Sequence, residues 1–145
     1  MENVDYVDTF IAVAPDCVAE EGCAPPLRAG AATVASATFE LIERHPYALR
    51  SSDVIFRVWA DRQAIPEKDR EASRAEFYAR PRACLRSSDL GKRYGWGIHA
   101  DAEGRLAVYG VDTPEYAALA EGTDAAGRPV KVTAAMRSKR SGARG

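Results

Sequence analysis

The sequence has few cysteines and histidines, no long apolar run and almost no net charge. Its 145 residues include 3 Cys and 2 His. Cys17, Cys23 and Cys84 are an odd number without zinc-knuckle spacing, so we expect neither a disulfide framework nor a metal site. No apolar stretch approaches the roughly 18 residues of a membrane-spanning helix. The net charge of −1 excludes a protein that is basic overall.

The start of the chain is acidic, without the basic residues and apolar stretch of a secretory signal. Together with the cysteine usage, this predicts a cytoplasmic protein with no membrane partner. A length of 145 residues with 46% apolar types is typical of one globular domain. We therefore expect a single domain over residues 1–145, with a basic, flexible tail from about residue 137.

Charge is distributed unevenly along the chain. Residues 1–27 contain six acidic and no basic side chains, whereas residues 128–145 contain six basic and no acidic ones. Such asymmetry is typical of a basic interaction tail, but it also fits two chain ends that lie close together and pair. The sequence leaves both interpretations open.

Hydrophobic patterning predicts both strands and helices. Strands are expected at 9–14, 53–61 and 130–132, and helices at 33–45, 67–80 and 113–122. Two further strands flank a turn at Gly104, which predicts a β-hairpin over about 95–111. Because a hairpin is an antiparallel pair, the expected fold class is α+β. We expect a mainly antiparallel sheet with two to three helices packed against it.

The expected strand at 53–61 alternates apolar and polar residues, except that Ile55 and Trp59 lie on its otherwise polar face. Another element or a second subunit would cover these two side chains. A subunit-assembly role, with a homo-oligomer as the partner, is therefore one alternative function.

Three segments resemble a family of small bacterial proteins of unknown function. They are Thr9–Cys17 (TFIAVAPDC), Cys84–His99 (CLRSSDLGKRYGWGIH) and Ala135–Arg140 (AMRSKR). The resemblance extends over nearly the whole chain and implies a single-domain protein. It implies no activity, cofactor or catalytic residue.

The segment 80–99 is the densest in groups that bind ligands. Arg86, Lys92 and Arg93 stand near Tyr94 and Trp96, with glycines between them. In one interpretation the bases neutralise an anion while an aromatic ring stacks on a base or sugar. In the other, Trp96 faces the core, the glycines make room for a neighbouring element, and the bases project into water.

The basic tail supplies three more candidate ligand-binding residues, Arg137, Lys139 and Arg140. Our first hypothesis is therefore a binding domain in which both basic segments contact an anionic partner. That partner is a phosphorylated small molecule or nucleic acid. The sequence does not determine whether the two basic segments share one surface, and it indicates no cofactor.

A small enzyme is the alternative hypothesis. His99 is the candidate general base, and Asp101, two residues further on the same strand face, could orient its imidazole. Cys84, between two arginines that would lower the pKa of its thiol, is a candidate nucleophile beside His99. No phosphate loop, dinucleotide fingerprint or zinc-protease motif is present.

Overall fold

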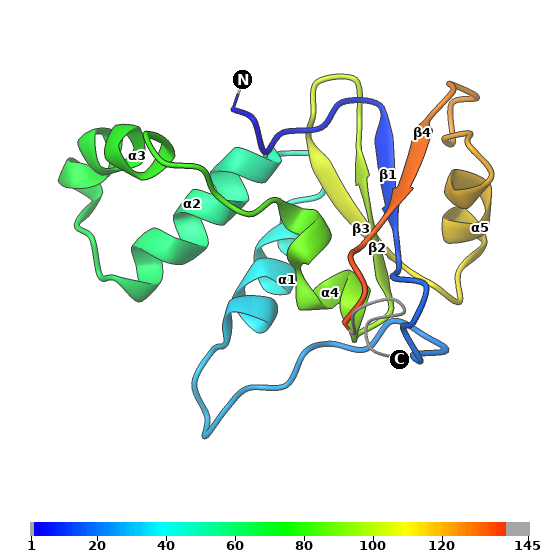
Figure 1. Cartoon of the computed structure of the whole chain (residues 1–145), viewed down its shortest axis with the longest axis horizontal. Coiled ribbons are helices and arrows are strands. Elements are labelled where there is room, and N and C mark those ends of the chain that lie inside the picture. The colour runs from blue at the N-terminus through cyan, green and yellow to red at the C-terminus, as the bar shows by residue number, and fades with distance from the viewer. Residues whose placement is uncertain (1, 139–145) are drawn as a thin grey trace, which may run out of the picture.

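The computed structural model describes residues 2–138 and has an α+β fold (Figure 1). In chain order the elements are β1 (Thr9–Ala12), α1 (Val34–Arg44), α2 (Ser51–Arg62), η1 (Glu67–Asp69), α3 (Arg70–Tyr78), η2 (Leu85–Ser87), α4 (Asp89–Lys92), β2 (Trp96–Ala100), β3 (Leu106–Gly110), α5 (Pro114–Ala120) and β4 (Lys131–Ala134), where η denotes a 3₁₀ helix. The α+β class is confirmed. The expected two to three helices are wrong, since five α-helices lie within residues 2–138.

The four strands form one mixed sheet in the order β3-β2-β1-β4. β2 pairs antiparallel with both β3 and β1, whereas β4 pairs parallel with β1. The sheet is therefore mostly antiparallel. The hairpin expected at about 95–111 is present, with its two strands at 96–100 and 106–110.

Helices cover both faces of the sheet (Figure 1). α1, α2 and α4 contribute to the larger core, in which Ile11 and Ile98 of the sheet pack with Ile42 and Leu90. α5 lies against the opposite face, where Phe10 contacts Tyr116 edge to face. This division follows from the strand pleat, because neighbouring residues such as Phe10 and Ile11 point to opposite faces.

α1 confirms the helix expected at 33–45. The side chain of Thr33 caps its first turn by accepting a hydrogen bond from the backbone N–H of Ser36, at 3.0 Å. The helix ends at Arg44, before Pro46, as expected of the residues that precede a proline. The helices expected at 67–80 and 113–122 are also present, as η1 with α3 and as α5.

The strand expected at 53–61 is wrong, because these residues form helix α2. Val54 and Val58, one helical turn apart, pack in the larger core. Phe56 and Ala60, also one turn apart, pack in a second cluster with Phe77 of α3. A helix buried on two sides thus produces the same i, i+2 alternation as a strand with one buried face.

The first and last described strands are neighbours, because β4 pairs with β1. None of the described helices has the length and apolar character needed to cross a membrane. The basic tail expected from about residue 137 falls largely outside the described residues, and Lys139 and Arg140 lie there.

Candidate functional site

The basic segment of the sequence folds as two short turns of helix. Cys84 precedes η2, and Ser88 caps α4 by accepting a hydrogen bond from the backbone N–H of Leu90 at 3.1 Å. Arg86 lies in η2, and Lys92 and Arg93 lie at the end of α4. The chain then enters the sheet, because strand β2 begins at Trp96.

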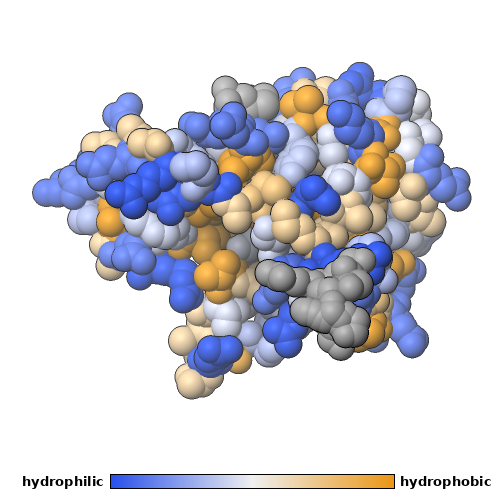
Figure 2. Space-filling view, viewed as in Figure 1, coloured by the Kyte–Doolittle hydropathy of each residue, from blue (hydrophilic) through white to orange (hydrophobic). Residues whose placement is uncertain are grey.

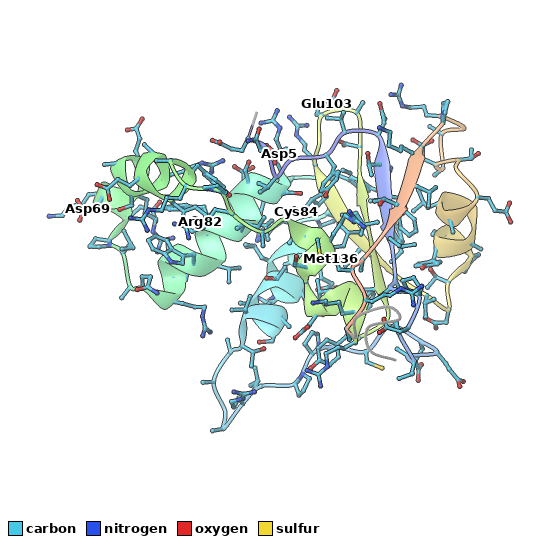
Figure 3. All side chains as sticks on the ribbon, in the orientation of Figure 1. Asp5, Asp69, Arg82, Cys84, Glu103 and Met136 are labelled. Carbon is cyan, nitrogen blue, oxygen red and sulfur yellow. The ribbon has the colours of Figure 1, made fainter. Side chains whose placement is uncertain are left out.

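The segment that follows β4 crosses these two turns (Figure 1). The Nε–H of Arg86 donates to the carbonyl of Ala134 at 2.7 Å, and the backbone N–H of Met136 donates to the carbonyl of Arg86 at 2.8 Å. The hydroxyl of Ser87 contacts the Met136 sulfur at 3.5 Å, and Figure 3 shows Met136 lying over this region. The structure thus brings Arg137, the next residue, beside the basic segment.

We call Arg86, Lys92, Arg93 and Arg137 the basic surface. Among residues 2–138, none of the four makes a salt bridge, whereas Arg44, Arg70, Arg74 and Arg128 each do. The guanidinium of Arg93 lies 5.9 Å from the ring centre of Tyr94. Within residues 2–138 these cations thus form no salt bridge, although the Asp16 carboxylate accepts the backbone N–H of Ser138, next to Arg137, at 3.0 and 3.2 Å.

The side chain of Trp96 packs against other parts of the protein. Its indole Nε1–H donates to the carbonyl of Cys23 at 2.8 Å, and its ring centre lies 4.7 Å from that of Phe39. A Cβ at Gly22 would come within 2.9 Å of the ring, so the loop before α1 lies directly on it. Trp96 therefore has little ring face left for stacking on a nucleobase.

His99 lies on the α5 face of the sheet, directly opposite Phe10 of β1. It is only 3% exposed. Its Nδ1 is 2.7 Å from the hydroxyl of Tyr47, which is 2.9 Å from the hydroxyl of Tyr109. Burial lowers the pKa of His99 and raises that of Tyr47, so both groups are neutral at pH 7. The Nε2 of His99 is buried and has no hydrogen-bond partner among the described residues.

Asp101 has a different role from the one expected of it. One of its carboxylate oxygens accepts hydrogen bonds from the backbone N–H groups of Glu103 and Arg105, both at 2.9 Å. It therefore closes the turn of the hairpin. The structure does not bring Asp101 into hydrogen-bond contact with His99.

Cys84 lies on the other side of the sheet, next to Leu85 of the larger core. Its sulfur accepts a hydrogen bond from the Tyr6 hydroxyl at 3.0 Å. Burial, helped by this bond, raises the pKa of Tyr6 to about 12. Because the sheet separates Cys84 from His99, the two do not form a nucleophile–base pair.

Sequence reasoning missed Tyr6 and Tyr47, the actual partners of Cys84 and His99. They lie 78 and 52 residues away along the chain, and no spacing rule connects positions so far apart. Within residues 2–138 no group of three or more His, Cys, Asp or Glu side chains is arranged to hold a metal ion.

Fold and site define a small α+β protein whose basic surface forms no salt bridge within residues 2–138. The chain belongs to a family of unknown function, DUF6157, whose model matches residues 1–141. Neither a curated protein nor a solved structure matches the chain.

Proposed function

We propose that the protein binds the phosphate backbone of nucleic acid through the basic surface. The observation that carries the proposal is the hydrogen bond from Met136 to the carbonyl of Arg86, which joins the two basic segments of the sequence. Cations without carboxylate partners attract phosphates, because binding costs no existing ion pair.

The arrangement of the cations supports an extended partner over a small phosphorylated molecule. Small ligands bind in concave sites that bury most of their surface. None of the four cations lines any of the three cavities described for the molecule. A polyanion needs no such cavity, because its successive phosphates contact charges along a convex surface.

The covered ring of Trp96 sets the expected mode of binding. Without stacking or base-edge contacts, affinity depends on phosphate neutralisation and is independent of sequence. Four cations predict a plot of log affinity against log salt with a slope of about −3, and affinities in the range of about 10⁻⁴–10⁻⁶ M typical of nonspecific binding.

Fluorescence anisotropy with a labelled single-stranded oligonucleotide tests the proposal. We expect binding that weakens steeply with salt, and at least about tenfold weaker binding by the double variant Lys92→Glu/Arg137→Glu. A matched control is Lys68→Glu/Arg80→Glu, which makes the same charge change at two exposed sites at the ends of the η1–α3 segment. Arg86 is left intact because it also fixes the residues after β4.

Two results would overturn the proposal. One is equal loss of binding in the two double variants, which would mean that only total charge matters. The other is binding of inorganic pyrophosphate or a mononucleotide as tight as that of the oligonucleotide, which would indicate a small phosphorylated ligand instead.

A further inference from the structure

A cavity of about 420 Å³ opens on the helical side of the molecule, and Leu85 and Ser87, on either side of Arg86, contribute to its wall. α1, α2, the end of α3 and the segment 82–89 enclose it. Figure 2 shows hydrophobic side chains gathered in the recess beside the α2–α3 lobe, and Figure 3 shows Arg82 and Cys84 on the segment that borders it. Its volume lies in the range of small-molecule sites.

The wall of the cavity is mainly apolar. Ile55, Val58 and Trp59 contribute from α2, Phe77 from α3 and Leu85 from η2. The ring centres of Trp59 and Phe77 lie 4.9 Å apart at 42°, so the two rings pack together in this wall, with the buried Phe77 behind the half-buried Trp59. Such a wall suits a ring or a short aliphatic chain of a ligand.

Two arginines give this apolar cavity a positive character. Arg82 donates its Nε–H to the carbonyl of Phe77 at 2.8 Å, and its guanidinium lies 3.9 Å from the centre of the Phe77 ring. Arg62 donates one Nη–H to the carbonyl of Ala32 at 3.1 Å. Each guanidinium is thus positioned by one hydrogen bond and retains further N–H donors.

The cations of the cavity exceed its acids. Neither Arg62 nor Arg82 makes a salt bridge within the described part of the chain, and Asp89 is the one acidic side chain that lines the cavity there. A carboxylate or sulfonate on a ligand would therefore meet donors that no described carboxylate occupies.

We infer that the cavity binds a small amphipathic monoanion, with its apolar body against Trp59 and Phe77 and its anionic group at Arg62 and Arg82. This site differs from the basic surface in its residues, because none of the four cations of that surface lines the cavity, although residues next to Arg86 do. The combination of an aromatic wall with guanidiniums that form no salt bridge in the described part of the chain selects this ligand class over neutral hydrophobes and over polyphosphates.

A pair of fluorescent probes tests the charge requirement. 8-Anilinonaphthalene-1-sulfonate carries an apolar body and one sulfonate, and N-phenyl-1-naphthylamine carries the same body without charge. We expect the intact protein to bind the sulfonate with a stoichiometry of one, at least about tenfold more tightly than the neutral amine. In Arg62→Met/Arg82→Met, which keeps the aliphatic stems, the two probes should bind with similar affinity.

The location of binding is tested through two cysteines. Cys84 lines the cavity, whereas Cys23 is exposed elsewhere. Mass spectrometry can follow the labelling of each cysteine by iodoacetamide. The sulfonate should slow the labelling of Cys84 and leave that of Cys23 unchanged. Ala83→Trp, at an exposed position on the cavity wall, should block both probes without lowering the melting temperature.

Lys92→Met/Arg137→Met is the control for charge, because it removes two cations from the basic surface alone. Loss of sulfonate binding in this control, an unprotected Cys84, or equal affinity of the intact protein for both probes would overturn the inference. So would the absence of binding by either probe. Each of these results is independent of the outcome with oligonucleotides.

Discussion

His99 illustrates how burial of a single residue affects behaviour in solution. Its ring is 3% exposed, and burial lowers its pKa below the ordinary value of 6.5, although Asp124, Asp101 and Asp8 act in the opposite direction. The unfolded chain therefore binds a proton at this residue more readily than the folded protein does. The contribution of His99 to the free energy of unfolding is therefore complete above about pH 6.5, the ordinary pKa of histidine. It decreases as the pH falls from there toward the lower pKa of the folded protein.

We expect this loss to disappear in His99→Gln. Chemical denaturation of the original protein between pH 7.5 and 5 should show a free energy of unfolding that falls by up to about 1.4 kcal/mol per pH unit more than that of the variant. His45→Gln is the control, because His45 is the second of the two histidines and is exposed. Equal pH slopes for His99→Gln and the original protein would contradict the prediction.

The candidate site could be predicted from sequence only where the relevant residues are close in the chain. Arg86, Lys92 and Arg93 lie within eight positions, and local turns of helix place them at or near the surface, with Arg93 exposed and the other two half-buried. The pairing of Tyr47 with His99 depends on a backbone of positive φ at Tyr47 and on the path of the chain between α1 and α2. Neither is encoded in a local pattern, because a bulky residue at positive φ is held there by its tertiary surroundings.

At the scale of elements, the first turn of α2 is held by an acidic residue from the start of the chain. The two carboxylate oxygens of Asp5 accept hydrogen bonds from the backbone N–H and the hydroxyl of Ser52, at 2.8 and 3.0 Å. Figure 3 shows Asp5 at this end of the helix. A negative charge here satisfies free N–H groups and interacts favourably with the helix dipole.

Removing this contact should destabilise the protein. We expect Asp5→Ala to lower the free energy of unfolding by about 1–2 kcal/mol, the usual cost of losing a charged cap. Urea denaturation measures the change. Glu2→Ala removes a charge from the same segment without touching Ser52, and it should cost much less. A similar loss in both variants would show that general electrostatics, not the cap, is responsible.

Several of the elements that sequence patterns predicted correctly have clear ends. α1 and α5 each begin at a threonine whose side chain accepts a backbone hydrogen bond, and the hairpin turns at Gly104, where φ is +83°. α2 was mistaken for a strand because its two buried stripes, on opposite sides of the helix, interleave in the sequence. α4 was missed because its four residues are too few to show a helical period.

At the scale of the whole molecule, the apolar interior is divided. Phe56, Ala60 and Phe77 form a cluster between α2 and α3, apart from the cores on the two faces of the sheet. α3 projects at one end of the molecule, on the side away from α5 (Figure 1). α3 is held to α2 by this small cluster and by polar contacts such as the Arg74–Asp53 salt bridge at 2.9 Å and the hydrogen bond from Tyr78 to the carbonyl of Ser52 at 2.7 Å. Within residues 2–138 it has no contact of this kind with the sheet cores, so local opening of α3 needs less free energy than global unfolding.

Hydrogen exchange should reveal this division. We expect Phe77→Ala to remove most amide protection in α3, through loss of about 3–5 kcal/mol of local packing, while amides of β1 and β2 keep most of theirs. Phe10→Ala is the comparison, because Phe10 is completely buried against α5. This variant should lower protection throughout the sheet. Equal loss of protection in β1 and β2 from both variants would refute the division.

The parallel pair of β1 and β4 has a consequence for how the protein is made. Thr9 is paired with Lys131 and Ala12 with Ala134, so strands from opposite ends of the chain are neighbours. During synthesis, β1 emerges first but gains this neighbour only when nearly the whole sequence has left the ribosome. Until then, one edge of β1 offers unpaired N–H and C=O groups to any other extended chain. A truncated product that ends before β4 therefore keeps an open sheet edge for its whole lifetime.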